Sequence, residues 1–184
     1  IGLGIPAEPL FRSSINDVVL KVNYHQPDEY TIDSTNVDVT LCCTGASYSL
    51  RVMLRDDNND YDVFGAEVHV ALNNGTPGKF INTGHSSSEK FQDRDPMTVK
   101  MSVQNLKDFN IASADFWVKS PERDVHVSTP GTDPHGVVIP GDWRWPLEWI
   151  CIKDAYPRFT DFAAQPEDPA NADWYNEWVT DKLY

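Results

Sequence analysis

The stretch that identifies the fold most directly runs from residue 48 to residue 55 and reads Tyr-Ser-Leu-Arg-Val-Met-Leu-Arg. Large apolar side chains occupy the even positions, and both arginines fall on odd ones. Because successive side chains of a β-strand point to opposite faces of the sheet, this alternation predicts a strand with one buried face and one wet face. Strands of this kind are typical of antiparallel sheets, which can leave one face in water.

The same alternation recurs along the chain, and we expect further strands over residues 15–24, 31–43, 63–72, 79–82, 98–103, 116–118 and 124–128. Clusters of turn-forming residues separate these segments, among them Asn73-Asn74-Gly75, which is a strong tight-turn signal. Short strands between turn clusters predict a mostly-β fold. We interpret it as an antiparallel β-sandwich, jelly-roll-like, with a short helical appendage at the C-terminal end.

The C-terminal part of the sequence departs from this strand pattern. Residues 130–146 are rich in Pro and Gly and predict an irregular arm. Over residues 152–164 apolar residues recur at steps of three and four, but Pro157 removes a helix N–H, so we expect two short helices. Too little chain follows the arm to fold alone, which predicts a single domain over residues 13–184 after an irregular lead-in over residues 1–12.

Composition and charge restrict the classes of partner. The chain has 184 residues, of which 40% are hydrophobic, as expected of a folded domain. Its 28 acidic residues outnumber its 15 basic ones, and the net charge of −13 repels phosphate backbones, which excludes nucleic acid as a partner. No apolar stretch approaches the roughly 18 residues of a membrane span. The sequence starts at Ile1 rather than Met, so we expect that an upstream export signal has been removed.

The three cysteines, Cys42, Cys43 and Cys151, lack the spacing of a structural zinc site. Cys42 and Cys43 are adjacent, and in a regular strand they would point to opposite faces. At most one of them would then face the core and meet Cys151. One disulfide and three buried thiols both remain compatible with the sequence.

The last third of the sequence carries a series of aromatic and proline motifs, namely Ile139-Pro140, Trp145-Pro146-Leu147-Glu148, Ala155-Tyr156-Pro157-Arg158-Phe159 and Asp173-Trp174-Tyr175. This series resembles the closing signature of LruC-type domains, and Asn16-Asp17-Val18-Val19 is similar to the strand that opens them. The family occurs in exported, often lipid-anchored, proteins of Bacteroidetes and some other bacteria, and its biochemical function is not established. The resemblance therefore implies an extracytoplasmic location, at the cell surface or in the periplasm, with lipid anchoring through a missing N-terminal segment. As a separate hypothesis, we expect the partner to be a protein or a glycan at the cell surface.

An acidic stretch offers the clearest candidate for a cofactor site. Asp56, Asn58, Asp60 and Asp62 place oxygen ligands at alternate positions, a pattern that can wrap a hard cation such as Ca²⁺. The stretch lacks the glycine and the distant glutamate of an EF-hand loop. The alternative interpretation is a solvated hairpin loop built from turn formers. No other cofactor is expected.

Tryptophans crowd the C-terminal region, and Trp143, Trp145, Trp149 and Trp174 are the candidate ligand-binding residues. Exposed indole rings beside carboxylates and amides suit the stacking of sugar rings, so these residues could bind a glycan. The alternative is that they seal one end of the sandwich, because tryptophans bury large areas and dominate small cores.

The sequence offers no motif for catalysis. It contains neither the Gly-x-Ser-x-Gly nucleophile motif nor a Gly-rich phosphate loop. Glu148 is the best single carboxylate for glycoside hydrolysis, but among 28 acidic residues some pair will always lie close together. Our first hypothesis is therefore a non-catalytic binding or structural module, exposed at the surface of an exported bacterial protein and related to adhesion. A carbohydrate-binding module that uses the Trp-rich region comes second, and a glycan-active hydrolase comes third.

Overall fold

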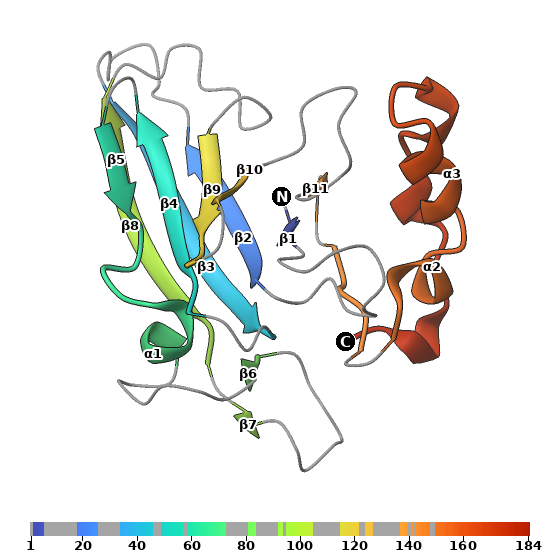
Figure 1. Cartoon of the computed structure of the whole chain (residues 1–184), viewed down its shortest axis with the longest axis horizontal. Helices are drawn as coiled ribbons and strands as arrows, with labels where there is room; N and C mark the ends of the chain where they lie inside the picture. The colour runs from blue at the N-terminus through green and yellow to red at the C-terminus, as the bar shows by residue number, and fades with distance from the viewer. Residues whose placement is uncertain are drawn as a thin grey trace.

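The computed structural model describes residues 2–5, 18–25, 34–45, 49–56, 59–72, 81–83, 92–93, 95–104, 115–121, 124–126, 137–139, 141, 143–147 and 150–184. Two β-sheets and a helical C-terminal segment make up these parts of the chain (Figure 1). The prediction of a mostly-β fold with a short helical C-terminal part is confirmed. The jelly-roll-like sandwich stays a prediction.

The larger sheet has the strand order β11-β1-β2-β3-β6-β7, with β8 also paired to β3. Its strands are β1 (Gly2–Ile5), β2 (Val18–His25), β3 (Ser34–Thr44), β6 (Ile81–Asn82), β7 (Gln92–Asp93), β8 (Met97–Gln104) and β11 (Val137–Ile139). The smaller sheet has the order β10-β9-β4-β5, formed by β4 (Arg51–Asp56), β5 (Asn59–Asp62), β9 (Asp115–Lys119) and β10 (Asp124–His126). All neighbouring strands are antiparallel except β6 and β7, which run parallel.

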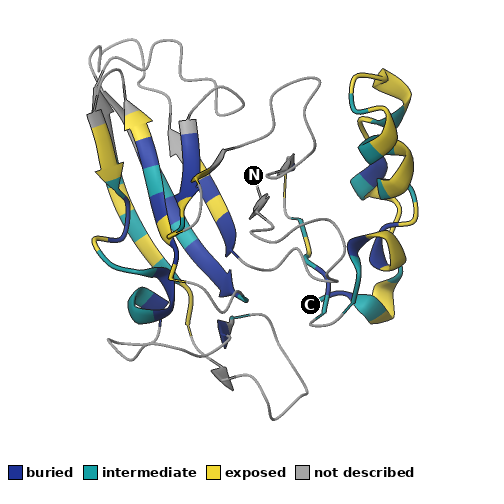
Figure 2. Ribbon diagram, viewed as in Figure 1, coloured by how far each residue is buried: buried dark blue, intermediate teal, exposed yellow. Residues whose placement is uncertain are grey.

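The two sheets share one hydrophobic core. Leu20 of β2 and Val39 of β3 belong to the same buried cluster as Leu54 of β4 and Phe116 of β9 (Figure 2). Residues 48–55 behave as their alternation predicts, because Leu50, Val52 and Leu54 are buried while Arg51 and Arg55 are exposed. Burying this aliphatic surface is the main force that holds the sheets together.

One predicted strand is wrong throughout. Residues 63–72 were expected to form a strand, but residues 63–67 belong to no strand and Val68–Leu72 form the short helix α1. Val68 and Leu72 are four residues apart and both enter the shared core, which a helix allows and a strand would allow equally well. In the helix, the Glu67 carboxylate accepts the Val70 N–H of the first turn and the Glu67 backbone oxygen accepts the Ala71 N–H, and both bonds stabilise the start of α1.

Four short strands lie where the sequence predicted irregular chain. The lead-in over residues 1–12 contains β1, which pairs with both β2 and β11. The Pro/Gly-rich arm contains β11, and β5 and β7 lie in predicted loops. Each of these strands has four residues or fewer, which is too short to show an alternation. The strands β1 and β11 form by pairing with segments that are distant in sequence, whereas β5 forms a hairpin with β4 and β7 pairs with the nearby β6.

The helical C-terminal segment follows the prediction around Pro157. Helix α2 (Ile152–Ala155) and helix α3 (Phe159–Ala164) flank this proline. Three short 3₁₀ helices complete the segment, namely η2 (Pro169–Asn171), η3 (Trp174–Asn176) and η4 (Thr180–Lys182). None of the helices in the described ranges combines the length and the apolar character needed to cross a bilayer.

Candidate functional site

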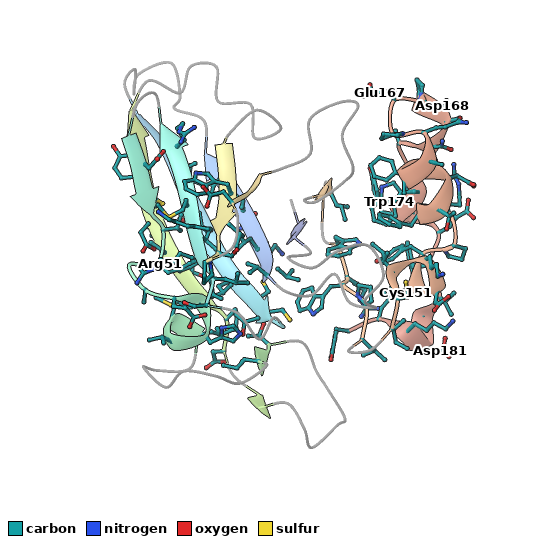
Figure 3. The ribbon with its side chains drawn as sticks, in the orientation of Figure 1. Arg51, Cys151, Glu167, Asp168, Trp174 and Asp181 are labelled. Carbon is teal, nitrogen blue, oxygen red and sulfur yellow. The ribbon has the colours of Figure 1, made fainter. Side chains whose placement is uncertain are left out.

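The aromatic side chains of the C-terminal segment gather around Trp174, which is only 2% exposed. Phe159 and Tyr156 meet its ring edge-on at centroid distances of 4.9 and 5.3 Å. Phe162 stacks on it at 5.6 Å, and Tyr175 lies edge-on at 5.9 Å. Figure 3 shows Trp174 on the side of the helical segment that faces the sheets. The arrangement is a packed aromatic core, which we call the aromatic cluster, and it leaves the Trp174 ring no face for a ligand.

Tyr156 ties this cluster to the irregular arm. The Tyr156 hydroxyl donates to the backbone oxygen of Arg144 at 2.5 Å. The centroids of the Tyr156 and Trp143 rings lie 6.0 Å apart. Burial raises the pKa of Tyr156 above its ordinary value of 10.0, so the hydroxyl stays a neutral donor at any physiological pH. The hydrogen bond therefore fixes the arm against helix α2 without any charge.

Trp143 and Trp145 pack on the outer face of the larger sheet, against Val19, Cys42 and Cys43. The pairing of β2 with β3 passes from Val19↔Cys43 to Leu20↔Leu41, so Cys42 is an extra residue in a β-bulge. A bulge sets two residues of one strand against one of its neighbour. Both cysteines therefore join the same outer cluster, and the prediction that they point to opposite faces is wrong.

The Cys42 thiol in this cluster is held in its neutral form. Burial raises the pKa of Cys42 to about 11, and its Sγ lies 3.7 Å from the backbone oxygen of Thr40. Cys151 is partly buried at the start of α2, and none of the three cysteines forms a disulfide.

The arm and the end of the described chain are paired. Pro146 and Leu183 form an isolated antiparallel bridge. The Tyr184 N–H donates to the Trp145 oxygen at 3.1 Å, and the Leu147 N–H donates to the Lys182 oxygen at 2.8 Å. The backbone pairing of residues 145–147 with residues 182–184 thus joins the two ends of the helical segment. It lies next to the outer face of the larger sheet.

The four predicted glycan-binding tryptophans do not form one surface. Trp174 is buried, Trp143 and Trp145 are partly buried, and Trp149 lies outside the described residues. Trp143 contacts Tyr156 of the aromatic cluster, whereas Trp145 contacts Tyr184 at 6.1 Å. Glu148, the candidate carboxylate for glycoside hydrolysis, also lies outside the described residues.

Among the described aromatic side chains of the C-terminal segment, the most exposed one is not among the four predicted ligand-binding tryptophans. Trp178 is 51% exposed, although it lies only four residues after the buried Trp174. Both tryptophans follow an acidic residue, so nothing local distinguishes them. Helix η3 ends at Asn176, and the extended chain after it turns Trp178 away from the aromatic cluster.

The acidic stretch forms a hairpin between β4 and β5, in which Asp56 pairs with Asn59. Arg55 donates from Nε to Asp60 Oδ1 at 2.8 Å and from a terminal nitrogen to Oδ2 at 3.2 Å. Asp62 pairs with Arg51 and accepts the Gly65 N–H at 3.0 Å. Asp60 and Asp62 of β5 thus each form an ion pair with an arginine of β4.

Two of the four predicted Ca²⁺ ligands cannot be compared with the structure. Asn58 lies outside the described residues, and the Asp56 side chain is not described. Within the described part of the chain, no three His, Cys, Asp or Glu side chains meet as a metal site requires. The Ca²⁺ site stays a prediction.

A partly buried carboxylate at the start of α1 was missed by sequence reasoning. Glu67 Oε1 accepts the Leu50 N–H at 3.2 Å and also bonds His69 Nδ1, while Oε2 accepts the Val70 N–H at 3.1 Å. Burial alone would raise the pKa of Glu67, but the bonds from His69 and Leu50 hold it below its ordinary value. The sequence places Glu67 and His69 two residues apart, but no local pattern indicates that the Glu67 carboxylate also accepts the N–H of the distant Leu50.

Comparisons with known proteins agree with this architecture. No curated protein sequence matches the chain. One solved structure, that of a putative lipoprotein from Bacteroides ovatus, superposes with a TM-score of 0.65 at 11% sequence identity. The match covers 100% of this chain and 74% of the other, and at this identity it shows the fold alone. Residues 128–175, which span the whole arm, α2, α3 and Trp174, match a family described as a domain of unknown function (DUF4842).

Proposed function

We propose that the chain is a non-catalytic binding or structural module of the LruC type, carried by an exported bacterial protein and displayed at the cell surface or in the periplasm. The observation that supports this most is the burial of Trp174 inside the aromatic cluster. A sugar-binding platform or a catalytic pocket needs its side chains within reach of a ligand. Here the aromatic side chains of the C-terminal segment act mainly as packing between the arm and the helices.

The comparisons support the proposed location. The structural neighbour is named a putative lipoprotein, and the matched family has no assigned function. We therefore propose that the full protein is exported and held by a lipid anchor upstream of this chain. The net charge of −13 would keep such a domain soluble and favour a protein partner over an anionic surface.

Protease treatment of intact cells tests this location. The full-length protein carries an epitope tag in a loop of this domain, and trypsin is added to washed cells before immunoblotting. We expect the tagged band to disappear while a periplasmic marker stays intact. A band that survives until the outer membrane is permeabilised would place the module in the periplasm, and recovery in the cytosolic fraction would contradict the proposal.

Deletion of the module tests the adhesive role. Cells that lack residues 13–184 of the protein are compared with the parent strain for attachment to a host-cell layer and to one another. We expect attachment to fall while growth and secretion of other proteins stay unchanged. Unchanged attachment would contradict a role in adhesion and would leave a structural role in surface assembly.

One observation favours carbohydrate binding as a second candidate. The indole of Trp178 is 51% exposed and follows Glu177, which is also exposed, so a sugar ring could stack there beside a carboxylate. A glycan array probed with the purified chain and with Trp178→Ala tests this. Tyr61→Ala is the matched control, since Tyr61 is 42% exposed on the smaller sheet. Binding lost in Trp178→Ala alone would support the candidate, and no binding by the parent chain would remove it.

A further inference from the structure

We propose that the Glu67 carboxylate is a pH-sensitive latch that holds helix α1 against the start of strand β4, and that its protonation releases this corner of the core. The latch comprises Glu67 together with the three groups that donate to it, namely the Leu50 N–H, the Val70 N–H and the His69 ring. It lies far from the C-terminal segment, so it is independent of the proposed function.

One carboxylate here satisfies donors from two different elements. The Leu50 N–H lies directly before β4, and the Val70 N–H is an orphan donor of the first turn of α1. The Val68 N–H donates to the Leu50 oxygen at 2.8 Å and completes the junction. With five residues, α1 is too short to be stable by itself in water, so this junction and its packing keep it folded.

The latch covers part of the shared core. Val68 is fully buried and Leu72 nearly so, and both pack in the cluster that Leu50 and Phe64 also join. The side chains of His69 and Glu67 are only 5% and 12% exposed. Opening the junction would therefore admit water to the edge of the core between the two sheets.

Other charged groups near the junction are paired or lie elsewhere. On β4, Arg51 and Arg55 hold Asp62 and Asp60 of β5 on the exposed face of the smaller sheet. On β3, Cys42 and Cys43 pack under the tryptophans of the outer face, and Asp38 alternates with the buried Val37 and Val39. On α1 itself, His69 is the one titratable side chain. Within the described residues the charge state at the junction is therefore set by Glu67 and His69.

The direction of the pH effect follows from the bonds. A charged carboxylate is a stronger acceptor than a neutral carboxyl group, so proton uptake weakens all three bonds together. Because these bonds hold the pKa of folded Glu67 below the value of 4.5 that is usual for an exposed glutamate, the stabilisation is complete above that value. It is lost as the pH falls through the lower pKa of the folded state.

Amide hydrogen exchange tests the latch. Protection factors, corrected for the intrinsic pH dependence of exchange, are measured from about pH 7 to about pH 3, which spans the titration of a glutamate. We expect the amides of residues 50 and 68–71 to lose protection at least about tenfold more than those of β3, as a local opening would. Equal losses at α1 and β3 would overturn the proposal, because the whole domain would then be opening.

Two variants and a matched control separate the latch from general acid sensitivity. Glu67→Gln keeps an acceptor oxygen but cannot titrate, so the local pH dependence should vanish. Glu167→Gln makes the same change at an exposed position of the C-terminal segment and should behave like the parent chain (Figure 3). Local pH dependence that persists in Glu67→Gln would overturn the proposal.

If Glu67→Gln fails to fold, His69→Phe, which keeps a ring but has no donor, provides an independent test. The His69 bond lowers the pKa of Glu67, so its removal should move the midpoint of local opening to a higher pH. A midpoint unchanged from that of the parent chain would overturn the latch.

Discussion

The core between the sheets and the aromatic cluster of the C-terminal segment are both buried and apolar, but they differ in their side chains and in the backbone that carries them. Between the sheets, aliphatic side chains such as Leu54 and Val39 alternate along strands whose ladders hold the backbone. In the C-terminal segment, five rings including Trp174 pack together while the backbone forms only short helical turns. Where regular pairing is absent, large side chains with specific ring geometry supply the order. We therefore expect the two regions to respond differently when each loses its central side chain.

The largest effect is expected from Trp174→Ala. The change removes the ring that four others contact, and aromatic-to-alanine changes in cores cost about 3–5 kcal/mol. Urea unfolding is followed by near-ultraviolet circular dichroism, which reports ring packing, and by far-ultraviolet dichroism, which reports the sheets. We expect the near-ultraviolet signal to be lost first, whereas coincident transitions would show that the two regions unfold as one unit.

Trp178→Ala is the matched control for that variant. Because this ring is half exposed and outside the aromatic cluster, its removal should change the free energy of unfolding by less than about 0.5 kcal/mol.

A slightly smaller effect is expected from Leu54→Ala, which opens a cavity between the sheets. Leu54 is fully buried, and such changes cost about 2–5 kcal/mol. Here both dichroism signals should shift together to lower urea concentration, because the C-terminal segment rests on the larger sheet through Trp143 and Trp145. A near-ultraviolet transition that stays in place would mean that the aromatic cluster folds without the sheets.

Tyr156→Phe should cost about 1 kcal/mol, the net value of one hydrogen bond, because the Arg144 oxygen loses its donor. The variant also has a distinct pH signature. Since burial raises the pKa of folded Tyr156 above 10.0, the parent chain should lose stability as the pH rises past that value, when the unfolded state releases the proton. Thermal unfolding at alkaline pH should show a smaller loss in Tyr156→Phe, and equal losses would contradict the raised pKa.

Apart from the Trp178→Ala control, the smallest effect is expected at the hairpin of β4 and β5. Arg55 and Asp60 are both substantially exposed, so Asp60→Asn should destabilise the chain by no more than about 1 kcal/mol. Melting with millimolar Ca²⁺ and with EDTA distinguishes the two interpretations of this hairpin. A rise in Tm that EDTA reverses and that Asp60→Asn abolishes would assign a cation site, and no shift would leave a hairpin held by arginine–aspartate pairs.

The fold was predictable where the side-chain pattern was long enough. Residues 48–55 have a clear alternation, and Pro157 marks the break between α2 and α3. Strands such as β1 and β11 could not be predicted, since their few residues become strands only through distant partners. For the candidate site, the sequence could not distinguish the buried Trp174 from the exposed Trp178, because burial depends on where the backbone turns after η3. The bulge at Cys42 could not be predicted for a related reason, because it depends on the register between β3 and β2.

The pairing of Pro146 with Leu183 has a consequence for how this part of the molecule can change over evolutionary time. It brings the two ends of residues 147–182 side by side, so this stretch leaves the body of the protein and returns at the same place. The entropic cost of closing such a loop rises only slowly with its length. Homologues can therefore lengthen, shorten or replace the helical excursion without displacing a strand, and we expect insertions and deletions to concentrate between the two paired ends.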